Sequence, residues 1–313
     1  MTDQHLRAEV IGFDSGWGCR DFRCEDGPLS VSADNILLRL RNLGVETKWR
    51  GPLGLKFIGN HAELKTKEGT LAPTLEALRR LSNHVQIALK NGNIPIVIGG
   101  DHSSAVGTWS GVVAATNSFR KFGLVWLDAH LDSHTYETSY QGKWGGWWHG
   151  QPVTALLGHG LPELRQVGGN AAKISSEHLS IIGPHSFEPA ELAFVKKHNV
   201  RVYFLNEVQE RGFAVCFDEA VRRATTGTDY FGLTVDLDAF QPADAPGVGA
   251  AESQGLVAAE VLPILKTIAW HPRFRGLEIA EFNPYQDVQN KTRQLIEKLI
   301  ESAFTKPLLK IDE

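Results

Sequence analysis

The sequence predicts an α/β protein, a single-domain three-layer α/β/α sandwich around a mostly parallel sheet of roughly eight strands. Apolar runs that are too short for helices alternate along the chain with longer segments of helical periodicity. This alternation is typical of parallel strands joined by right-handed crossovers, with helices on both faces of the sheet. Three of the apolar runs end directly in carboxylates or imidazoles, at the edge where open α/β sheets place their active sites.

The first half of the chain is expected to form strands at 8–13, 45–49, 94–98 and 122–127, with 45–49 at an edge of the sheet. Helical spacing predicts helices at 30–43 and 74–90, and a further helix that Ser103 or Ser104 caps. In the helix at 74–90, the side chains expected to face inward are Leu75, Leu78, Leu81, Val85, Ile87 and Leu89. Residues 14–28 and 50–71 are expected to be loops.

The second half continues the same alternation of strands and helices. Strands are expected at 178–183, 200–204 and 230–235, and a final strand at 276–280 within the stretch 274–282. Helices are expected to begin at 152 and to span 189–198, 208–224, 257–268 and 288–304. The segment 135–150 is expected to be a loop whose exposed aromatic residues form a lid, a pocket wall or a contact with another subunit: Tyr136, Tyr140, Trp144, Trp147 and Trp148.

Length and composition favour one globular catalytic domain spanning 1–313. The chain has 313 residues, of which 42% are hydrophobic and 22% are charged, enough to bury a large core. A net charge of −4 argues against nucleic acid or an anionic membrane as the main partner. Cys19 and Cys24 could pair or bind a metal, but their spacing matches no common zinc site, so these two and Cys216 are expected to be free thiols in a reducing compartment. The polar N-terminus favours a cytoplasmic protein.

Metal-ligating side chains follow three of the predicted strands. Asp101 and His102 follow 94–98, and similar clusters follow 122–127 and 230–235. Without Asp101, the set consists of four carboxylates and two imidazoles: His102, Asp128, His130, Asp132, Asp236 and Asp238. Oxygen and nitrogen donors without thiolates suit Mn²⁺ or another octahedral divalent ion better than structural zinc. So many anionic ligands would repel one another unless cations offset them, which favours two ions.

Five motifs in these segments resemble the ureohydrolase superfamily, which includes arginase, agmatinase and formimidoylglutamase. They are Gly-Gly-Asp-His-Ser at 99–103, Asp-Ala-His-Leu-Asp at 128–132, His-Gly-Gln-Pro at 149–152, Val-Asp-Leu-Asp at 235–238 and Glu-Phe-Asn-Pro at 281–284. The motifs occur in the family's order and cover nearly the whole chain. The resemblance implies an arginase-like fold and a hydrolase that cleaves a C–N bond of a linear amidine.

The resemblance also implies roles for individual residues. His102, Asp128, Asp132 and Asp236 resemble terminal ligands, whereas His130 and Asp238 complete a pair of manganese sites, which Ni²⁺ or Co²⁺ would also suit. Asp132 is expected to be catalytic as well. Glu281 matches the carboxylate that receives the substrate guanidinium, and His149 matches a proton shuttle to the leaving amine.

The substrate end departs from the arginase pattern. Glu188 remains available for an α-ammonium group, but His134 stands where arginase has Asn. Both are candidate substrate-binding residues, together with Glu281. The segment 245–248, Ala-Pro-Gly-Val, leans toward formimidoylglutamase, whereas the loop 16–28 leans toward arginase.

These features favour hydrolysis of L-arginine to L-ornithine and urea. The alternatives within the superfamily are formimidoylglutamase, which releases formamide from N-formimidoyl-L-glutamate, and hydrolysis of agmatine or another guanidino acid. A one-zinc amidohydrolase is disfavoured by the extra ligands His102 and Asp132, and a non-catalytic metal-binding relative by the complete ligand set. The family commonly forms homo-oligomers, so a trimer or hexamer is expected.

Overall fold

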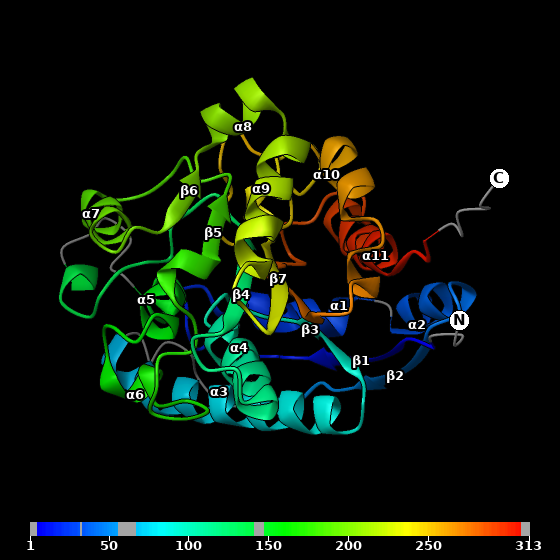
Figure 1. Ribbon diagram of the computed structural model, residues 1–313, viewed down its shortest axis with the longest axis horizontal. Helices are drawn as coiled ribbons and strands as arrows, with labels where there is room; N and C mark the ends of the chain where they lie inside the picture. The colour runs from blue at the N-terminus through cyan, green and yellow to red at the C-terminus, as the bar shows by residue number, and fades with distance from the viewer. Residues whose placement is uncertain (1–4, 32, 56–66, 141–146, 308–313) are drawn as a thin grey trace.

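The protein is built around one eight-stranded sheet with the strand order β2-β1-β3-β8-β7-β4-β5-β6 (Figure 1). The computed structural model describes residues 5–31, 33–55, 67–140 and 147–307. The strands are β1 (Arg7–Gly12), β2 (Glu46–Arg50), β3 (Ile94–Ile98), β4 (Phe122–Leu127), β5 (Leu179–Ile182), β6 (Arg201–Tyr203), β7 (Tyr230–Asp236) and β8 (Phe274–Ala280). Every pairing between these strands is parallel, which confirms the predicted fold class and the edge position of β2.

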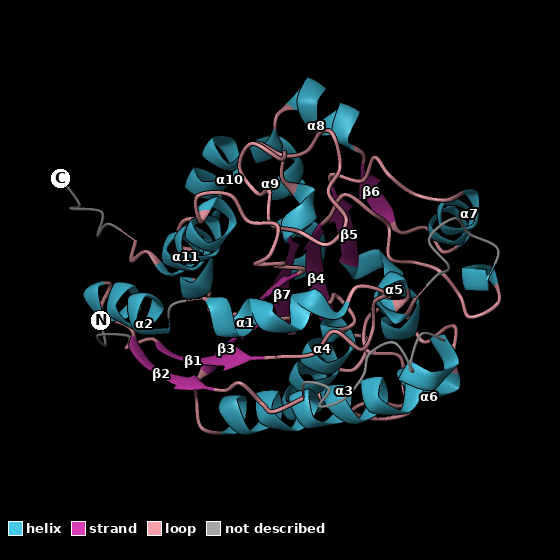
Figure 2. Cartoon of the chain, turned by 180° about the vertical axis from the view of Figure 1, so that it is seen from behind, coloured by secondary structure: helices cyan, strands magenta, loops and turns pink. Residues whose placement is uncertain are grey.

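Helices cover both faces of the sheet, as Figures 1 and 2 show. The longer helices are α2 (Ala33–Asn42), α3 (Lys67–Lys90), α4 (Ser104–Thr116), α7 (Pro189–Lys197), α9 (Phe213–Thr225), α10 (Ala258–Leu265) and α11 (Lys291–Phe304). The shorter ones are α1 (Gly27–Ser30), α5 (Pro152–Leu156), α6 (Pro162–Arg165) and α8 (Leu205–Arg211). None of the helices in the described part of the chain combines the length and the apolarity that crossing a bilayer requires.

The two faces of the sheet have separate hydrophobic cores. Alternate strand residues point to opposite faces, so Val125 and Leu127 of β4 pack with α2, α9, α10 and α11, whereas Leu124 and Trp126 pack with α3, α4 and α5. The inner strands β3, β4 and β7 are therefore buried on both sides, which explains why their sequences are almost continuously apolar. A sheet held between two cores gives the ends of its strands fixed positions.

The strand register places the residues that follow β3, β8, β7 and β4 next to one another at one edge of the sheet. Ile98 of β3 pairs with Ile279 of β8, Ile279 pairs with Val235 of β7, and Val235 pairs with Leu127 of β4. The residues directly beyond this row therefore emerge side by side at the carboxyl edge. All the predicted metal ligands lie just past it.

The predicted helix at 74–90 was too short, and one of its inward residues was wrong. In the structure α3 begins at Lys67, so the end of the expected loop 50–71 is helical, and Pro73 lies inside the helix. Ile87 is 44% exposed, whereas Ala88 is fully buried. The buried face follows Leu81, Val85 and Ala88 at the i, i+4, i+7 spacing, and Ile87 lies about 200° around the helix from Val85.

The predicted helix at 208–224 is two helices. Gly212 adopts φ +86 and separates α8 from α9, a backbone conformation that glycine adopts without steric cost. Residues expected to be loop at 14–28 contain a 3₁₀ helix at Phe22–Asp26 and the start of α1. Ser103 occupies the cap position of α4 but has a helical backbone conformation, φ −59 and ψ −22, and makes no side-chain capping bond. The Ser104 hydroxyl donates to Glu278 instead.

Candidate metal and substrate site

The six predicted ligands meet at the carboxyl edge of the sheet. The Nδ1 atom of His102 lies 2.9 Å from Asp236 Oδ2, 3.1 Å from Asp132 Oδ2 and 3.3 Å from Asp128 Oδ2. His130 Nδ1 lies 3.2 Å from Asp238 Oδ2 and 3.5 Å from Asp128 Oδ1. Asp128 thus faces both histidines and stands between two groups of donors.

Each group is compact enough to hold one ion. Ligand atoms of His102, Asp128, Asp132 and Asp236 all lie within 4.8 Å of one another, and so do those of Asp128, His130 and Asp238. Only His130 is not buried. The strands fix this convergence, because three ligands follow β4 while the others follow β3 and β7.

The buried carboxylates of this cluster repel one another electrostatically. Burial and the neighbouring Asp128 raise the pKa of Asp132 to about 7, and burial together with Asp238 raises the pKa of Asp236 well above its usual value. Burial alone would lower the pKa of His102, but the surrounding carboxylates raise it well above normal. Both shifts show an excess of buried negative charge, which a cation stabilises.

Two buried atoms support a cation at this position. His102 Nδ1 and Asp132 Oδ2 are enclosed and lie 3.1 Å apart, but within the described part of the chain neither makes a hydrogen bond of acceptable angle. Buried polar atoms are normally satisfied, so such exceptions suggest a missing ligand. Carboxylate oxygens and imidazole nitrogens are donors for Mn²⁺ and similar divalent ions. The residues therefore fit a pair of divalent cations.

Glu281 lies beside the cluster, immediately after β8. Its Oε1 accepts a hydrogen bond of 2.8 Å from the His102 backbone N–H and lies 3.1 Å from His149 Nδ1. Glu281 adopts φ +67, a left-handed conformation that costs about 1–3 kcal/mol in a residue other than glycine. Its own N–H is held by Gly100 O at 2.8 Å, which fixes this turn and points the carboxylate toward the cluster.

His149, whose side chain is 31% exposed, forms an ion pair with the buried carboxylate of Glu281. Burial alone would lower the pKa of His149, but the Glu281 carboxylate raises it to about 9. His149 in turn lowers the pKa of Glu281, against the effect of burial. The imidazole is therefore protonated at neutral pH, and the carboxylate is ionised.

A cavity of about 570 Å³ opens over the cluster. Its wall includes Asp132, His149 and Glu281, together with residues of the segment 19–23. A Cβ atom at Gly249 would lie 3.1 Å from Glu281 Oε2, so the glycine leaves this oxygen open toward the cavity. A cationic substrate group can reach it there.

The predicted substrate residues His134 and Glu188 are in contact. His134 Nε2 lies 3.2 Å from Glu188 Oε2 and 3.5 Å from Glu191 Oε2. Glu191 and His134 line the cavity, whereas Glu188 does not. The Glu191 carboxylate also accepts hydrogen bonds from the backbone N–H groups of Glu188 and Ser133. Sequence reasoning missed Glu191, although a Glu at the third position of a helix, where it can accept from the backbone N–H of the cap residue, is part of a capping signal.

The aromatic loop is less exposed than predicted. Trp148 is fully buried and donates a hydrogen bond to Thr70 Oγ1, and Trp147 is 8% exposed. Trp147 lines the cavity, which agrees with a pocket wall. Both are held inward because the 3₁₀ turn at Trp148–Gly150 packs onto α3. Trp144 lies outside the described residues.

Two further carboxylates lie behind the ligand imidazoles and were not predicted. Glu252 Oε1 is 3.4 Å from His130 Nε2. Glu278 accepts a hydrogen bond from Thr234 Oγ1, which lies 3.4 Å from His102 Nε2. Metal-binding histidines usually need such partners at the second ring nitrogen. Glu278 could have been found as the single charged residue in the run 276–280, Gly-Leu-Glu-Ile-Ala, whereas nothing local marked Glu252.

Together, the sheet edge and the cluster define a metal-binding α/β protein with a cavity for a cationic small molecule. Residues 24–305 match the model of the Arginase family. The arginase of Bacillus caldovelox is 33% identical over 302 residues, which cover 96% of this chain and 98% of that protein. The arginase of Brevibacillus brevis is 31% identical, with the same coverage of both chains.

Solved structures agree with this similarity. A crystal structure of arginase from Bacillus subtilis superposes with a TM-score of 0.85 at 29% identity, over 97% of this chain and all of that one. Formimidoylglutamase from the same species shares the fold, with a TM-score of 0.70 at 19% identity over 97% of this chain and 87% of that one. The chain belongs to the arginase family. This membership confirms the predicted class, a metal-dependent hydrolase that acts on the C–N bond of a guanidino group.

Proposed function

We propose that this protein is an arginase that hydrolyses L-arginine to L-ornithine and urea with two Mn²⁺ ions, Ni²⁺ or Co²⁺ being possible substitutes. The observation that carries the proposal is the position of Glu281, whose open Oε2 faces the cavity beside the six-ligand cluster. A planar guanidinium pairs well with a carboxylate. The arginases of B. caldovelox and Br. brevis, at 33% and 31% identity, support the same substrate.

His102, Asp128, Asp132 and Asp236 would hold one ion, and Asp128, His130 and Asp238 the second. When bound, the ions lower the pKa of a water molecule and polarise the substrate. Asp132 lies in both the cluster and the cavity wall, so it is placed to accept a hydrogen bond from the attacking water.

Glu281 would bind the substrate guanidinium, and His149 would donate a proton to the leaving amine. Glu281 fixes the guanidinium against the cluster through Oε2, while its Oε1 stays bonded to the His102 backbone and near His149. Because Nδ1 of His149 faces Glu281, the proton available to the leaving amine is the one at Nε2. General acids of this kind contribute about 10²–10⁴-fold to a rate.

The α-amino end of the substrate would lie toward His134, Glu188 and Glu191. Carboxylates at this end of the cavity would attract an α-ammonium group. Glu188 is the candidate that sequence comparison favours, and Glu191 lies closer to the cavity.

We further propose that 1–313 is a single catalytic domain, that it functions in the cytoplasm and that it assembles as a homo-oligomer, a trimer or hexamer. Neither nucleic acid nor a membrane is proposed as a partner. Sedimentation of the purified protein would measure its assembly state.

A substrate panel tests the proposed reaction. The manganese-loaded protein would be given arginine, agmatine, guanidinobutyrate and formimidoylglutamate, and urea and formamide would be measured. Urea from arginine, well above the other substrates, is the expected result. Formamide from formimidoylglutamate would replace the proposal with the second candidate, which the Ala-Pro-Gly-Val segment and the cationic Arg20 in the cavity wall favour.

A further inference from the structure

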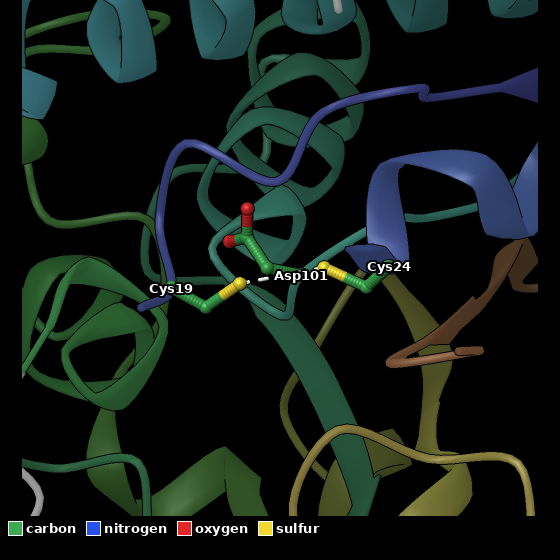
Figure 3. A group of neighbouring side chains, drawn as sticks. All are labelled: Cys19, Cys24 and Asp101. Atoms are coloured by element: carbon green, nitrogen blue, oxygen red, sulfur yellow. Dashed lines mark hydrogen bonds between the residues drawn. The ribbon is translucent and has the colours of Figure 1, made fainter. Parts of the chain in front are cut away.

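An unassigned pair of thiols lies in the cavity wall beside the site. Cys19 Sγ and Cys24 Sγ are 3.4 Å apart and point toward each other next to the Asp101 carboxylate (Figure 3). Both side chains are buried, and Cys19 lines the cavity whereas Cys24 lies behind it. We propose that this pair is an oxidative modification site, in which a hydroperoxide converts the dithiol to a Cys19–Cys24 disulfide and thereby suppresses turnover at the adjacent site.

The backbone between the cysteines already holds the two sulfurs together. Both thiols donate to the carbonyl oxygen of Asp21, at 2.8 Å from Cys19 and 3.6 Å from Cys24. A disulfide needs an S–S distance of about 2.05 Å, so the sulfurs must approach by roughly 1.3 Å. Cys216, the third cysteine, lies in α9 among the residues of the opposite core, so the pair has no competing thiol.

A disulfide suits this pocket better than a metal ion does. The hydrogen bond with Cys24 alone would lower the pKa of Cys19, but burial and the charges of Asp101 and Glu281 raise it to about 12. A metal would hold both thiols permanently as thiolates beside Asp101, whereas disulfide formation ionises one thiol only transiently and leaves an uncharged product. Both oxygens of Asp101 also accept backbone N–H groups at 2.9 Å, from Gly18 and from Ser103.

Because Cys19 lines the cavity and Cys24 does not, Cys19 reacts with the hydroperoxide first. Cys19 Sγ loses its proton and attacks one oxygen of the hydroperoxide, whose O–O bond breaks. The other oxygen leaves as an alcohol or water with the proton, and Cys19 becomes a sulfenic acid. Cys24 Sγ then bonds to Cys19 Sγ, and its proton leaves with the sulfenic hydroxyl as water. The two sulfurs supply the two electrons that reduce the peroxide.

The consequence for turnover follows from the residue before Cys19. Gly18 donates its N–H to Asp101 Oδ2 at 2.9 Å, and its carbonyl accepts the His149 N–H at 3.0 Å. Movement of Cys19 toward Cys24 therefore displaces Gly18, which is hydrogen-bonded to His149 and to Asp101, the residue before His102. Since a misplacement of about 1 Å can cost on the order of a hundredfold in rate, we expect kcat/KM to fall by about ten- to a hundredfold.

The test treats the metal-loaded protein with tert-butyl hydroperoxide and follows two quantities together. Mass spectrometry of peptides measures the Cys19–Cys24 cross-link, and urea release from arginine measures turnover, before and after dithiothreitol. In the wild type and in the control Cys216→Ser, the loss of turnover should match the cross-linked fraction and reverse with reductant. Cys24→Ser should form no cross-link.

Two results of the peroxide treatment would overturn the proposal: thiols that stay reduced in the wild type, or a cross-link that leaves turnover unchanged. A third would be metal binding by the thiols, seen as a sulfur-to-cobalt charge-transfer band when Co²⁺ is added to the reduced protein. Cys24→Ser would remove that band. The turnover measurement rests on the proposed function, but the cross-link does not. A reduced protein that releases no urea would count against the arginase proposal alone.

Discussion

The two ends of the cavity are built in different ways. At the metal end, six ligands follow β3, β4 and β7, whose last residues are in register through β8, and all but His130 are buried. At the substrate end, His134, Glu191 and the segment 19–23 come from loops and from the start of a helix. The sheet therefore determines the chemistry, whereas the connections determine the substrate. Substitutions at the two ends should separate these contributions.

The largest effect is expected for Asp128→Asn at the metal end. Asp128 faces both histidines, so its loss weakens both groups of ligands. Loss of a residue that only supports a metal ligand typically costs about 10–100-fold in metal affinity or activity, so loss of a ligand shared by both groups should lower turnover by on the order of a hundredfold or more. Metal content after dialysis should fall in parallel. Asp229→Asn, an exposed aspartate at the opposite end of β7, is the control, and normal metal content in Asp128→Asn would refute the assignment.

Glu281→Gln tests the junction between the two ends. The amide retains the shape of the side chain but loses the charge that pairs with a guanidinium. We expect kcat/KM for arginine to fall by on the order of a hundredfold, since truncating a buried charge pair costs about 2–5 kcal/mol. Metal content should stay within about twofold, because Glu281 belongs to neither ligand group. A variant that loses its metal would instead place Glu281 at the metal end.

His149→Asn and the pH profile test the proton donor. The pKa of His149 is raised to about 9, so the donor form is complete at neutral pH and is lost as the pH rises through about 9. The wild-type kcat should therefore decline as the pH rises through about 9, which gives the pH profile an alkaline limb. The variant should lose about a hundredfold in kcat at pH 7 and lack the limb. An identical alkaline decline in wild type and variant would assign the limb to another group.

The smallest effects are expected at the substrate end. Glu188→Gln should raise KM for arginine by about tenfold, the effect of roughly 1.4 kcal/mol, and leave agmatine, which has the same guanidinium, unchanged. Glu191→Gln should also lower stability by about 1–3 kcal/mol, because its carboxylate accepts two backbone hydrogen bonds. Thermal unfolding distinguishes the two variants. Equal losses for arginine and agmatine would remove Glu188 from recognition of the α-amino end.

The features that the sequence predicted share a local cause. Apolar strands that end in Asp or His can be recognised in the sequence, and parallel pairing then brings their ends together, so all six predicted ligands lie in one cluster. Glu281 and His149 were found from motifs and lie beside the cluster, although their roles remain proposals. The eight strands were predicted close to their observed positions for the same reason.

The features that the sequence did not predict depend on contacts between distant segments. Glu252 meets His130 only because the chain after β7 folds back over the cluster, and a lone glutamate in a loop carries no such information. The inward position of Trp148 depends on a hydrogen bond to Thr70, far away in the chain. The break between α8 and α9 was marked only by Gly212, which helices sometimes tolerate.

The place of β8 in the sheet has a consequence for how the molecule assembles. This strand is the last in the chain, yet it lies between β3 and β7 and is the partner of both. During synthesis, β3 and β7 are complete before the segment that joins them has emerged. His102 therefore reaches the aspartates that follow β4 and β7 only when residues 274–280 insert into the middle of the sheet. Pairings of such long sequence separation are slow to form, so metal uptake should coincide with the final step of folding.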